Sequence, residues 1–165
     1  MQFTRAEIEA ALINMDRLRA EASSKGDWRI WAECLSDDVE FHDSLHGGFS
    51  GKEDVADFVV RVHAPFPNLR YQRLWTMIDV DQAEILFHQQ MILPEPEGYS
   101  GPPFAVDVWS RHRYAGDNLF SFKQDVTLSS EQANSNFKVW MAAGGKFLAE
   151  PLKPATDTKK TKPNE

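Results

Sequence analysis

The sequence predicts a single α+β domain, in which a curved antiparallel sheet wraps around three N-terminal helices. Two observations predict this arrangement. Apolar residues recur at three- and four-residue spacing in the first part of the chain, and at two-residue spacing from residue 69 to residue 128. Side chains cannot completely fill a strongly bent sheet that is closed by helices. We therefore expect a pocket with apolar walls at the wide end of a cone.

Caps and apolar stripes mark the expected helices. Thr4 and Glu7 form a capping box for a helix that ends near Gly26. Its buried stripe consists of Ile8, Leu12, Met15, Leu18 and Ala22. Asp27 begins a short second helix, which places Trp28, Trp31, Ala32 and Leu35 toward the core. A strand at 39–42 and a turn at Gly47, Gly48 and Gly51 precede a third helix, which begins at Lys52.

The rest of the domain is mainly strand. Alternating apolar residues predict strands at 69–80, 83–93, 104–115 and 119–128. Gly116, Asp117 and Asn118 are typical of a hairpin turn, and Ser129 caps a final helix. We expect one domain over residues 1–147. The proline- and lysine-rich residues 148–165 predict a disordered tail.

Composition excludes several classes of function. The net charge of −7 and the lack of a basic stripe argue against nucleic acid as a partner. No apolar run approaches the roughly 18 residues that cross a bilayer, so we expect no membrane span. The N-terminus enters an amphipathic helix directly, which argues against a signal peptide. The lone cysteine, Cys34, cannot form an intrachain disulfide and favours a cytoplasmic location.

Four local segments and the order of elements resemble a known superfamily. The segments are Gly26-Asp27-Trp28, Ser36-Asp37-Asp38-Val39, Gly48-Phe49-Ser50-Gly51 and Ala115-Gly116-Asp117. Over residues 4–143 the chain resembles the nuclear transport factor 2-like (NTF2-like) superfamily, with its cystatin-like fold. It is most similar to the SnoaL-like polyketide cyclase, ketosteroid isomerase and limonene epoxide hydrolase branches. The resemblance implies a homodimer formed through the outer face of the sheet.

The resemblance also nominates individual residues. Asp43 falls where ketosteroid isomerases carry a general-base aspartate, and Asp125 falls where limonene epoxide hydrolase carries an inward carboxylate. The oxyanion-hole donors of the isomerases would fall near Ser110 and near Asn14 or Met15, and neither donor is preserved. Gln90 replaces the carboxylate of the hydrolase Arg-x-Asp, so we do not expect epoxide hydrolysis by that triad.

Strand periodicity indicates which other polar groups could converge. His88 and Gln90 share one face of their strand, Ser110 and His112 share one face of the next, and Asp125 aligns with Lys123. A histidine beside a carboxylate in a sheltered pocket is a general acid/base unit. We therefore expect Asp125 to pair with His88 or His112. The alternative is that both histidines lie on the solvated outer face.

The preferred hypothesis is an enzyme without cofactor or metal, acting on a small hydrophobic substrate of polyketide, terpenoid or steroid type. It would be a cyclase, isomerase or dehydratase. The catalytic candidates are Asp125, His88, Asp43 and His112. The substrate-binding candidates are Gln90, Ser110, Trp75, His42, Met15 and Trp109.

Several alternatives stay open. Tyr71, Arg73 and Trp75 alternate along one strand and could line the pocket or a dimer interface. His42, Asp43 and His46 form a cluster of residue types that bind metals, but in a strand Asp43 would point away from the two histidines. A non-catalytic binding or adaptor domain of the same fold is the second hypothesis for the whole chain.

Overall fold

The structure is a computed structural model, in which residues 3–155 are described. In chain order the elements are α1 (Arg5–Lys25), the short 3-10 helix η1 (Trp31–Cys34), β1 (Leu35–Asp43), β2 (Gly47–Ser50), α2 (Lys52–His63), β3 (Arg70–Asp79), β4 (Glu84–Ile92), β5 (Ala105–Gly116), β6 (Leu119–Thr127) and α3 (Ser130–Ala142).

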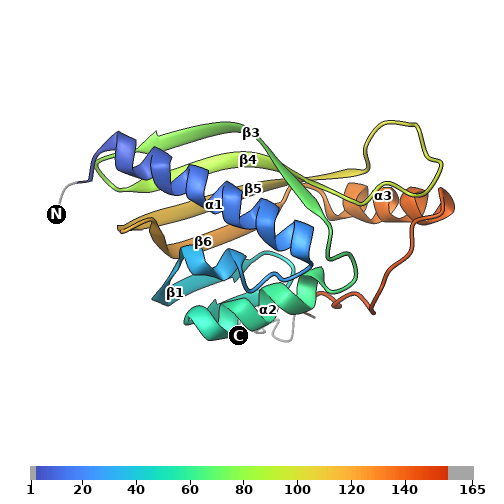
Figure 1. Ribbon diagram of the computed structural model, residues 1–165, viewed down its shortest axis with the longest axis horizontal. Coiled ribbons are helices and arrows are strands. Elements are labelled where there is room, and N and C mark those ends of the chain that lie inside the picture. Colours follow the sequence, from blue (N-terminus) through green and yellow to red (C-terminus); the bar gives the residue numbers. More distant parts are fainter. Residues whose placement is uncertain (1–2, 156–165) are drawn as a thin grey trace, which may run out of the picture.

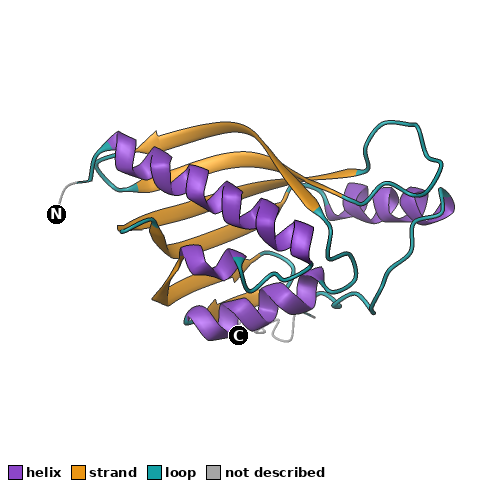
Figure 2. Cartoon of the chain, viewed as in Figure 1, coloured by secondary structure: helices purple, strands orange, loops and turns teal. Residues whose placement is uncertain are grey.

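The strands form one mixed sheet in the order β2-β1-β6-β5-β4-β3. Helices α1 and α2 lie against one face of this sheet, and α3 packs at one end of β5 (Figure 1). Figure 2 shows the strands curving behind the two long N-terminal helices. The predicted α+β class with a curved sheet around helices is confirmed. No helix among residues 3–155 is long and apolar enough to cross a membrane.

Local signals at the ends of elements are confirmed. Thr4 and Glu7 form the reciprocal capping box of α1, and the Ser129 side chain accepts the Gln132 amide at the start of α3. Asp117 and Asn118 both adopt positive φ angles between β5 and β6, as a two-residue hairpin turn requires. The predicted α1 stripe is buried against the sheet: Ile8, Leu12, Met15, Leu18 and Ala22.

Three features of the fold differ from the prediction. The second helix is only the four-residue η1, and Leu35 already belongs to β1. The glycines at 47 and 48 pair with β1 as the short strand β2 instead of forming only a turn. Strand β1 pairs in parallel with β6, so the sheet is not purely antiparallel. The spacing of Trp28, Trp31 and Leu35 fits a turn followed by a strand as well as a helix, and strand direction leaves no mark on local periodicity.

A bulge in β3 decides which of its side chains face the helices. Arg73 pairs with Gln89, whereas Trp75 pairs with His88, so Leu74 is an extra residue in β3. A bulge of this kind reverses the alternation of the side chains that follow it. Tyr71 therefore faces inward, and Trp75 faces outward with His88.

The C-terminal segment returns to the open end of the fold. The Leu148 amide donates to the Pro65 carbonyl at 2.8 Å, and the Ala155 amide donates to the Leu45 carbonyl at 2.8 Å. Residues 148–155 of the predicted disordered tail thus have defined contacts. Residues 156–165 of that tail lie outside the described residues.

Candidate active site

A cavity of about 550 Å³ lies between the sheet, α2, α3 and the C-terminal segment. Most of its wall is apolar and aromatic: Trp28, Trp31, Phe41, Phe58, Val59, Val62, Phe66, Met91, Val106, Val108, Phe137, Met141, Phe147 and Leu152. Its polar wall includes Arg19, Asp43, His46, His63, Tyr71, Gln89, Lys123 and Asp125. A cavity of this size and composition suits a small, largely hydrophobic molecule with a few fixed polar contacts.

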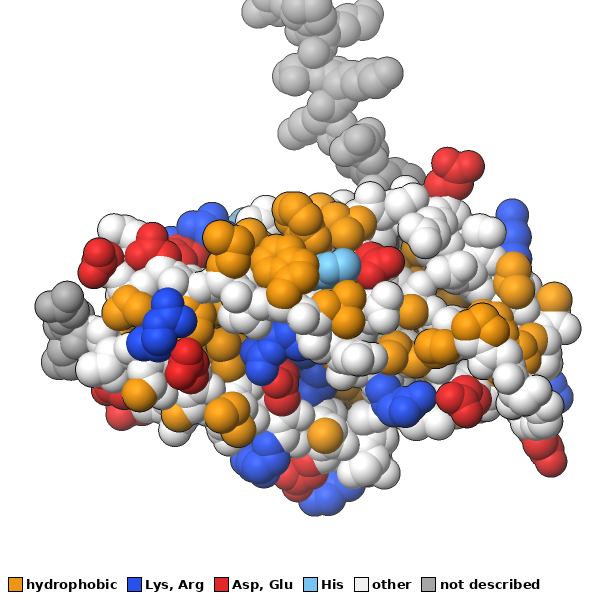
Figure 3. Space-filling model, turned by 90° about the horizontal axis from the view of Figure 1, so that it is seen from above, with side chains coloured by type: hydrophobic (Ala, Val, Ile, Leu, Met, Phe, Trp, Pro, Cys, Tyr) orange, Lys and Arg blue, Asp and Glu red, His pale blue; other side chains and the backbone are white. Residues whose placement is uncertain are grey.

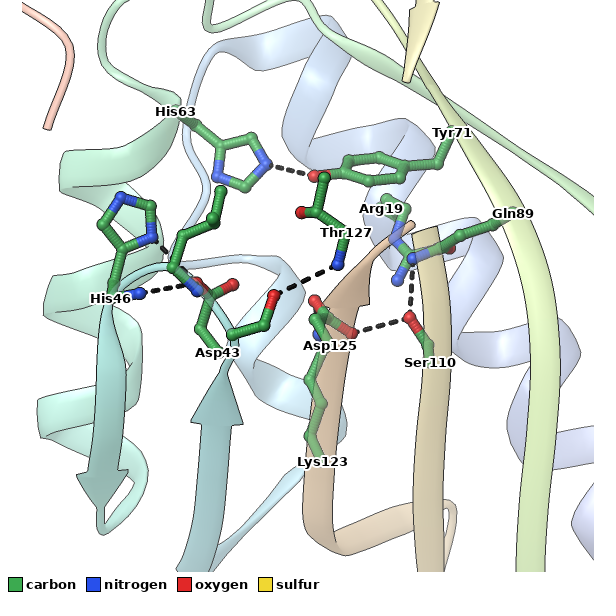
Figure 4. Close-up of polar contacts among 12 residues, drawn as sticks. Arg19, Asp43, His46, His63, Tyr71, Gln89, Ser110, Lys123, Asp125 and Thr127 are labelled. Carbon is green, nitrogen blue, oxygen red and sulfur yellow. Dashed lines mark hydrogen bonds and ion pairs between the residues drawn. The ribbon is translucent and has the colours of Figure 1, made fainter. Parts of the chain in front are cut away.

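Two carboxylates lie side by side in the polar wall. The parallel register of β1 and β6 pairs Asp43 with Asp125, and Phe41 with Lys123. Register partners on adjacent strands are separated by about 4.8 Å and project to the same face. Figure 4 shows the two aspartates on neighbouring strands. The parallel pairing is therefore what brings two residues 82 positions apart in the sequence to one site.

Asp43 is held through only one of its oxygens. Its Oδ1 accepts the amides of Leu45 and His46 at 2.9 Å each, and it lies 2.8 Å from His46 Nδ1. No hydrogen bond from the described residues reaches Oδ2. Burial raises the pKa of Asp43, but the hydrogen bonds from His46 and Leu45 outweigh it, so the net pKa lies below the usual value. Asp43 is thus an ionised carboxylate with one oxygen available to the cavity.

The pKa of His46 is shifted upward, whereas the pKa of Asp43 is shifted downward. The hydrogen bond to Asp43 raises the pKa of His46 above its usual value, while burial alone would lower it. A raised histidine pKa favours the imidazolium form near neutral pH. Asp43 and His46 therefore form a titratable pair within hydrogen-bond reach at the cavity wall.

Asp125 stands at the end of a directional hydrogen-bond chain. Arg19 Nη1 donates to Gln89 Oε1 at 2.8 Å, and Gln89 Nε2 donates to Ser110 Oγ at 2.9 Å. The Ser110 hydroxyl then donates to Asp125 Oδ1 at 2.6 Å, as Figure 4 shows. Because arginine can only donate, it fixes the orientation of the Gln89 amide and hence the direction of the whole chain.

The second oxygen of Asp125 is paired with Lys123. Burial lowers the pKa of Lys123, and the adjacent Asp125 charge opposes that change. The ammonium group also lies 4.2 Å from the centre of the Phe41 ring. Lys123 and Asp125 thus form a buried ion pair, in which each charge stabilises the other against desolvation.

His63 and Tyr71 close another side of the cavity. His63 Nδ1 donates to the Val59 carbonyl at 2.8 Å, so Nε2, 2.9 Å from Tyr71 Oη, accepts the phenol proton. Burial lowers the pKa of His63 to about 3, and burial also raises the pKa of Tyr71. Both groups are therefore neutral near pH 7, and they shape the wall without carrying charge.

The sequence of residues 16–121 matches the family model of the SnoaL-like domain. The chain belongs to this family. Among curated proteins, none matches the sequence significantly.

Solved structures agree with the SnoaL-like assignment at the level of the fold. An LEH-like epoxide hydrolase of M. tuberculosis is 12% identical, with a TM-score of 0.58 over 81% of this chain and 94% of that one. A SnoaL-like protein of unknown function from Burkholderia thailandensis is 13% identical, with a TM-score of 0.57 over 78% and 100%. A steroid delta-isomerase of Pseudomonas aeruginosa is 12% identical, with a TM-score of 0.56 over 87% and 98%.

Three of the predicted site residues lie together in this SnoaL-like domain. Asp43 and Asp125 line the cavity, and Ser110 supports Asp125 from behind. The expected pairing of Asp125 with His88 or His112 is wrong, because its partners are Ser110 and Lys123.

His88 and Gln90 face outward, which corrects their assignment to the cavity. His88 Nε2 lies 2.9 Å from Asp107 Oδ1, and Gln90 also donates to Asp107. Among the three consecutive polar residues of β4, Gln89 is the one that faces the cavity. Polar residues occupy three consecutive positions of this strand, and both of its faces carry apolar neighbours. The alternation therefore could not show which polar group lies inside.

Five further candidates lie away from the cavity. Trp75 and Trp109 are on the outer face, with Trp75 reversed by the β3 bulge. His42 is exposed on the face of β1 opposite Asp43, next to Phe122. Met15 is fully buried in the α1 core.

His112 is the fifth of these candidates. It shares the inward face of β5 with Ser110 but is buried between the Phe87 and Phe120 rings. Burial lowers its pKa well below the usual value, and neither ring nitrogen has a hydrogen-bond partner within residues 3–155. It is a neutral core residue instead of a partner for Asp125.

Two contributors to the site were not assigned to it from the sequence. Arg19 occupies a stripe position of α1, four residues after Met15 and three before Ala22, and a charged residue in an apolar stripe was the available signal. His46 was considered only as a metal ligand. Within the described residues, no group of three or more His, Cys, Asp or Glu side chains could hold a metal ion.

Proposed function

We propose that this SnoaL-like protein is an acid/base enzyme that needs no cofactor and acts on a small hydrophobic substrate in the cavity. The reaction would be a cyclisation, isomerisation or dehydration of a polyketide-, terpenoid- or steroid-like molecule. The observation that carries the proposal is the free Oδ2 of Asp43, which lies in an apolar-walled cavity beside Asp125.

Asp43 is the group best placed to accept a proton. Three donors fix its Oδ1, so Oδ2 is oriented and exposed to the cavity. An ionised carboxylate in a sheltered apolar site can take a proton from a carbon next to a carbonyl group. It can then return that proton to another carbon or to a departing hydroxyl. The proton balance closes within the substrate, without a co-reactant.

Asp125 is the second catalytic candidate and has a different role in this proposal. Both of its oxygens already accept hydrogen bonds, from Ser110 and Lys123. We propose that Asp125 positions the Lys123 ammonium group at the cavity wall. The ammonium group would there stabilise the negative charge that develops on the substrate oxygen. Asp43 therefore replaces Asp125 as the leading base.

The titratable pairs favour an enzyme over a carrier. A pocket that only stores a ligand needs apolar walls and a few neutral hydrogen-bonding groups. This cavity instead holds the Asp43–His46 pair at 2.8 Å and the buried Lys123–Asp125 pair. Buried ionised groups cost stability unless they are paired, and they cluster at sites that use them.

Proton abstraction can be tested without knowing the natural substrate. The probe is β-tetralone, a bicyclic ketone with acidic α-hydrogens, whose exchange with D₂O is followed by NMR. We expect the protein to accelerate exchange and Asp43→Asn to lower the rate by about 100-fold or more. Asp125→Asn should lower it by roughly tenfold, since it removes electrostatic support instead of the base. Thermal unfolding of each variant verifies that it is folded. An Asp43→Asn protein with unchanged exchange would remove Asp43 from the mechanism.

We also propose a homodimer through the outer face of the sheet. Large apolar side chains are exposed on this face: Leu74, Trp75, Met77, Trp109, Val126 and Leu128. Figure 3 shows hydrophobic side chains gathered on the surface beside a histidine. Exposed aromatic clusters of this kind are typical of interfaces. Light scattering should give twice the monomer mass of 18.8 kDa, and a monomer would contradict the proposal.

A further inference from the structure

Arg19 is a buried cation in the wall of the cavity. It lies on the inner side of α1 with 7% of its surface exposed, and it lines the cavity. Within residues 3–155 it has no carboxylate within salt-bridge distance, and its hydrogen-bonding partner is the neutral amide of Gln89. Its positive charge is therefore not neutralised by the protein groups that are described.

The other charges around Arg19 are already paired. Asp125 is paired with Lys123, Asp43 with His46, and Asp16 with Arg73. The cavity wall thus holds two carboxylates, three side chains that are cationic near pH 7 (Arg19, Lys123 and Lys138) and a fourth, His46, when it is protonated. This local excess of positive charge contrasts with the net charge of −7 of the whole chain. Lys138 is exposed to solvent, so Arg19 is the buried part of this excess.

Aromatic contacts offset only part of the cost of burying this charge. The guanidinium carbon lies 4.5 Å from the centre of the Tyr71 ring and 6.0 Å from that of Trp31. The negative face of an aromatic ring attracts a cation, most strongly where water is excluded. Such contacts stabilise a cation but leave its N–H donors unused, and a guanidinium has five of these donors.

The unused donors of Arg19 are accessible from the cavity. Among the guanidinium groups, Arg73 Nη1 is sealed in the protein without a partner, whereas no nitrogen of Arg19 is sealed in this way. Gln89 and the Tyr71 ring also fix the plane of the Arg19 guanidinium. A planar, oriented guanidinium with free N–H groups is suited to bidentate binding of a carboxylate or a similar planar anion.

We infer that the ligand of this cavity is an amphipathic anion, with a carboxylate bound by Arg19 and an apolar body against the aromatic wall. The inference rests on the proposed function in taking this cavity as the substrate site. The chain through Gln89 and Ser110 separates Arg19 from Asp125. A ligand carboxylate can therefore bind Arg19 without displacing the partners of the two aspartates, and the apolar body lies along the aromatic wall.

A pair of probes that differ only in charge tests this inference. Isothermal titration calorimetry of the full chain compares β-naphthoate with the neutral β-naphthamide, which has nearly the same shape. We expect naphthoate to bind about tenfold tighter or more. In Arg19→Gln the two affinities should agree within about twofold, because the naphthamide affinity stays and the preference is lost. Equal affinities in the unmodified protein, or no binding of either probe, would overturn the inference.

Two control variants separate the possible causes. Arg17 lies on the same helix but is exposed and paired with Glu21, so Arg17→Gln should keep the full naphthoate preference. If Arg17→Gln loses it too, the preference reflects general charge and the inference fails. Asp43→Asn should also keep the preference, since it leaves Arg19 in place. A retained preference with unchanged proton exchange in Asp43→Asn would reject the proposed function and keep the anion site. Equal affinities for the two probes in the unmodified protein, together with exchange that depends on Asp43, would reject the anion site and keep the proposed function.

Discussion

The two faces of the sheet each carry a histidine–aspartate pair of almost the same length. His46 Nδ1 lies 2.8 Å from Asp43 on the inner face, and His88 Nε2 lies 2.9 Å from Asp107 on the outer face. The inner pair lines a cavity with a buried ion pair and aromatic walls. The outer pair lies among exposed tryptophans. Pair geometry alone therefore does not mark a catalytic unit; the enclosed surroundings of Asp43 do.

The same contrast holds for ion pairs. On the inner face, Lys123 is paired with Asp125 and its side chain is almost inaccessible to water. Outside, Arg111 and Arg113 share Glu84 and are about half exposed. Water screens the outer charges and can replace a lost partner, whereas nothing replaces the Lys123 charge. The predictions below compare matched substitutions on the two faces.

The largest expected effect is on stability. Lys123→Met leaves Asp125 with only its Ser110 hydrogen bond and should lower the free energy of unfolding by about 3 kcal/mol. Arg113→Met on the outer face should lower it by less than about 1 kcal/mol, because Arg111 still binds Glu84. Urea denaturation measures both values. The double variant Lys123→Met/Asp125→Asn should recover much of the lost stability. A Lys123→Met protein as stable as the parent would contradict the buried-pair account.

A smaller effect is expected on catalysis. His46→Gln removes the charge that keeps Asp43 ionised and oriented, so β-tetralone exchange should slow by roughly tenfold. His88→Gln changes the matching pair outside and should alter the rate by less than about twofold. The pH–rate profile separates orientation from simple damage, since loss of the His46 charge moves the acidic limb toward higher pH. Equal losses in the two variants would remove the distinction between the faces.

The smallest effect is a pH dependence of stability. Because the pKa of His46 is raised in the fold, its contribution is full below 6.5 and is lost as pH rises through the raised value. Because the pKa of Asp43 is lowered, its contribution is full above 3.8 and is lost as pH falls through the lowered value. The stability difference between the parent and His46→Gln should therefore shrink as pH rises above 6.5 through the raised pKa of His46. In an Asp43→Asn background this loss with rising pH should disappear, because the burial that remains lowers the pKa of His46. An unchanged trend there would assign it to another group.

Particular residues show which features of the fold and the site can be predicted from the sequence. Helix caps at Thr4 and Ser129 and the turn at Asp117 and Asn118 are local signals, and they were predictable because their hydrogen bonds join neighbouring residues. Asp43 was found through a family resemblance, and its neighbour Asp125 through the same resemblance and strand alternation. The fact that they are neighbours depends on the parallel β1–β6 pairing, which no local pattern reveals.

The errors on the sheet faces also have physical causes. One extra residue, Leu74, reverses the side chains after it, and a bulge leaves no clear mark in the sequence. Gln89 and Gln90 are chemically identical neighbours, so only the three-dimensional register shows which one faces the cavity. Arg19 could have been found, because a charged residue in a buried helical stripe is itself a signal of a partner or a ligand.

The most direct test of the central claim compares the two aspartates of the matched pairs. Asp43→Asn and Asp107→Asn make the same chemical change, one inside the cavity and one on the outer face. With β-tetralone as the probe, Asp43→Asn should lose about 100-fold or more of the exchange rate, while Asp107→Asn should stay within about twofold of the parent. Equal rates in the two folded variants would show that proton transfer does not take place at Asp43.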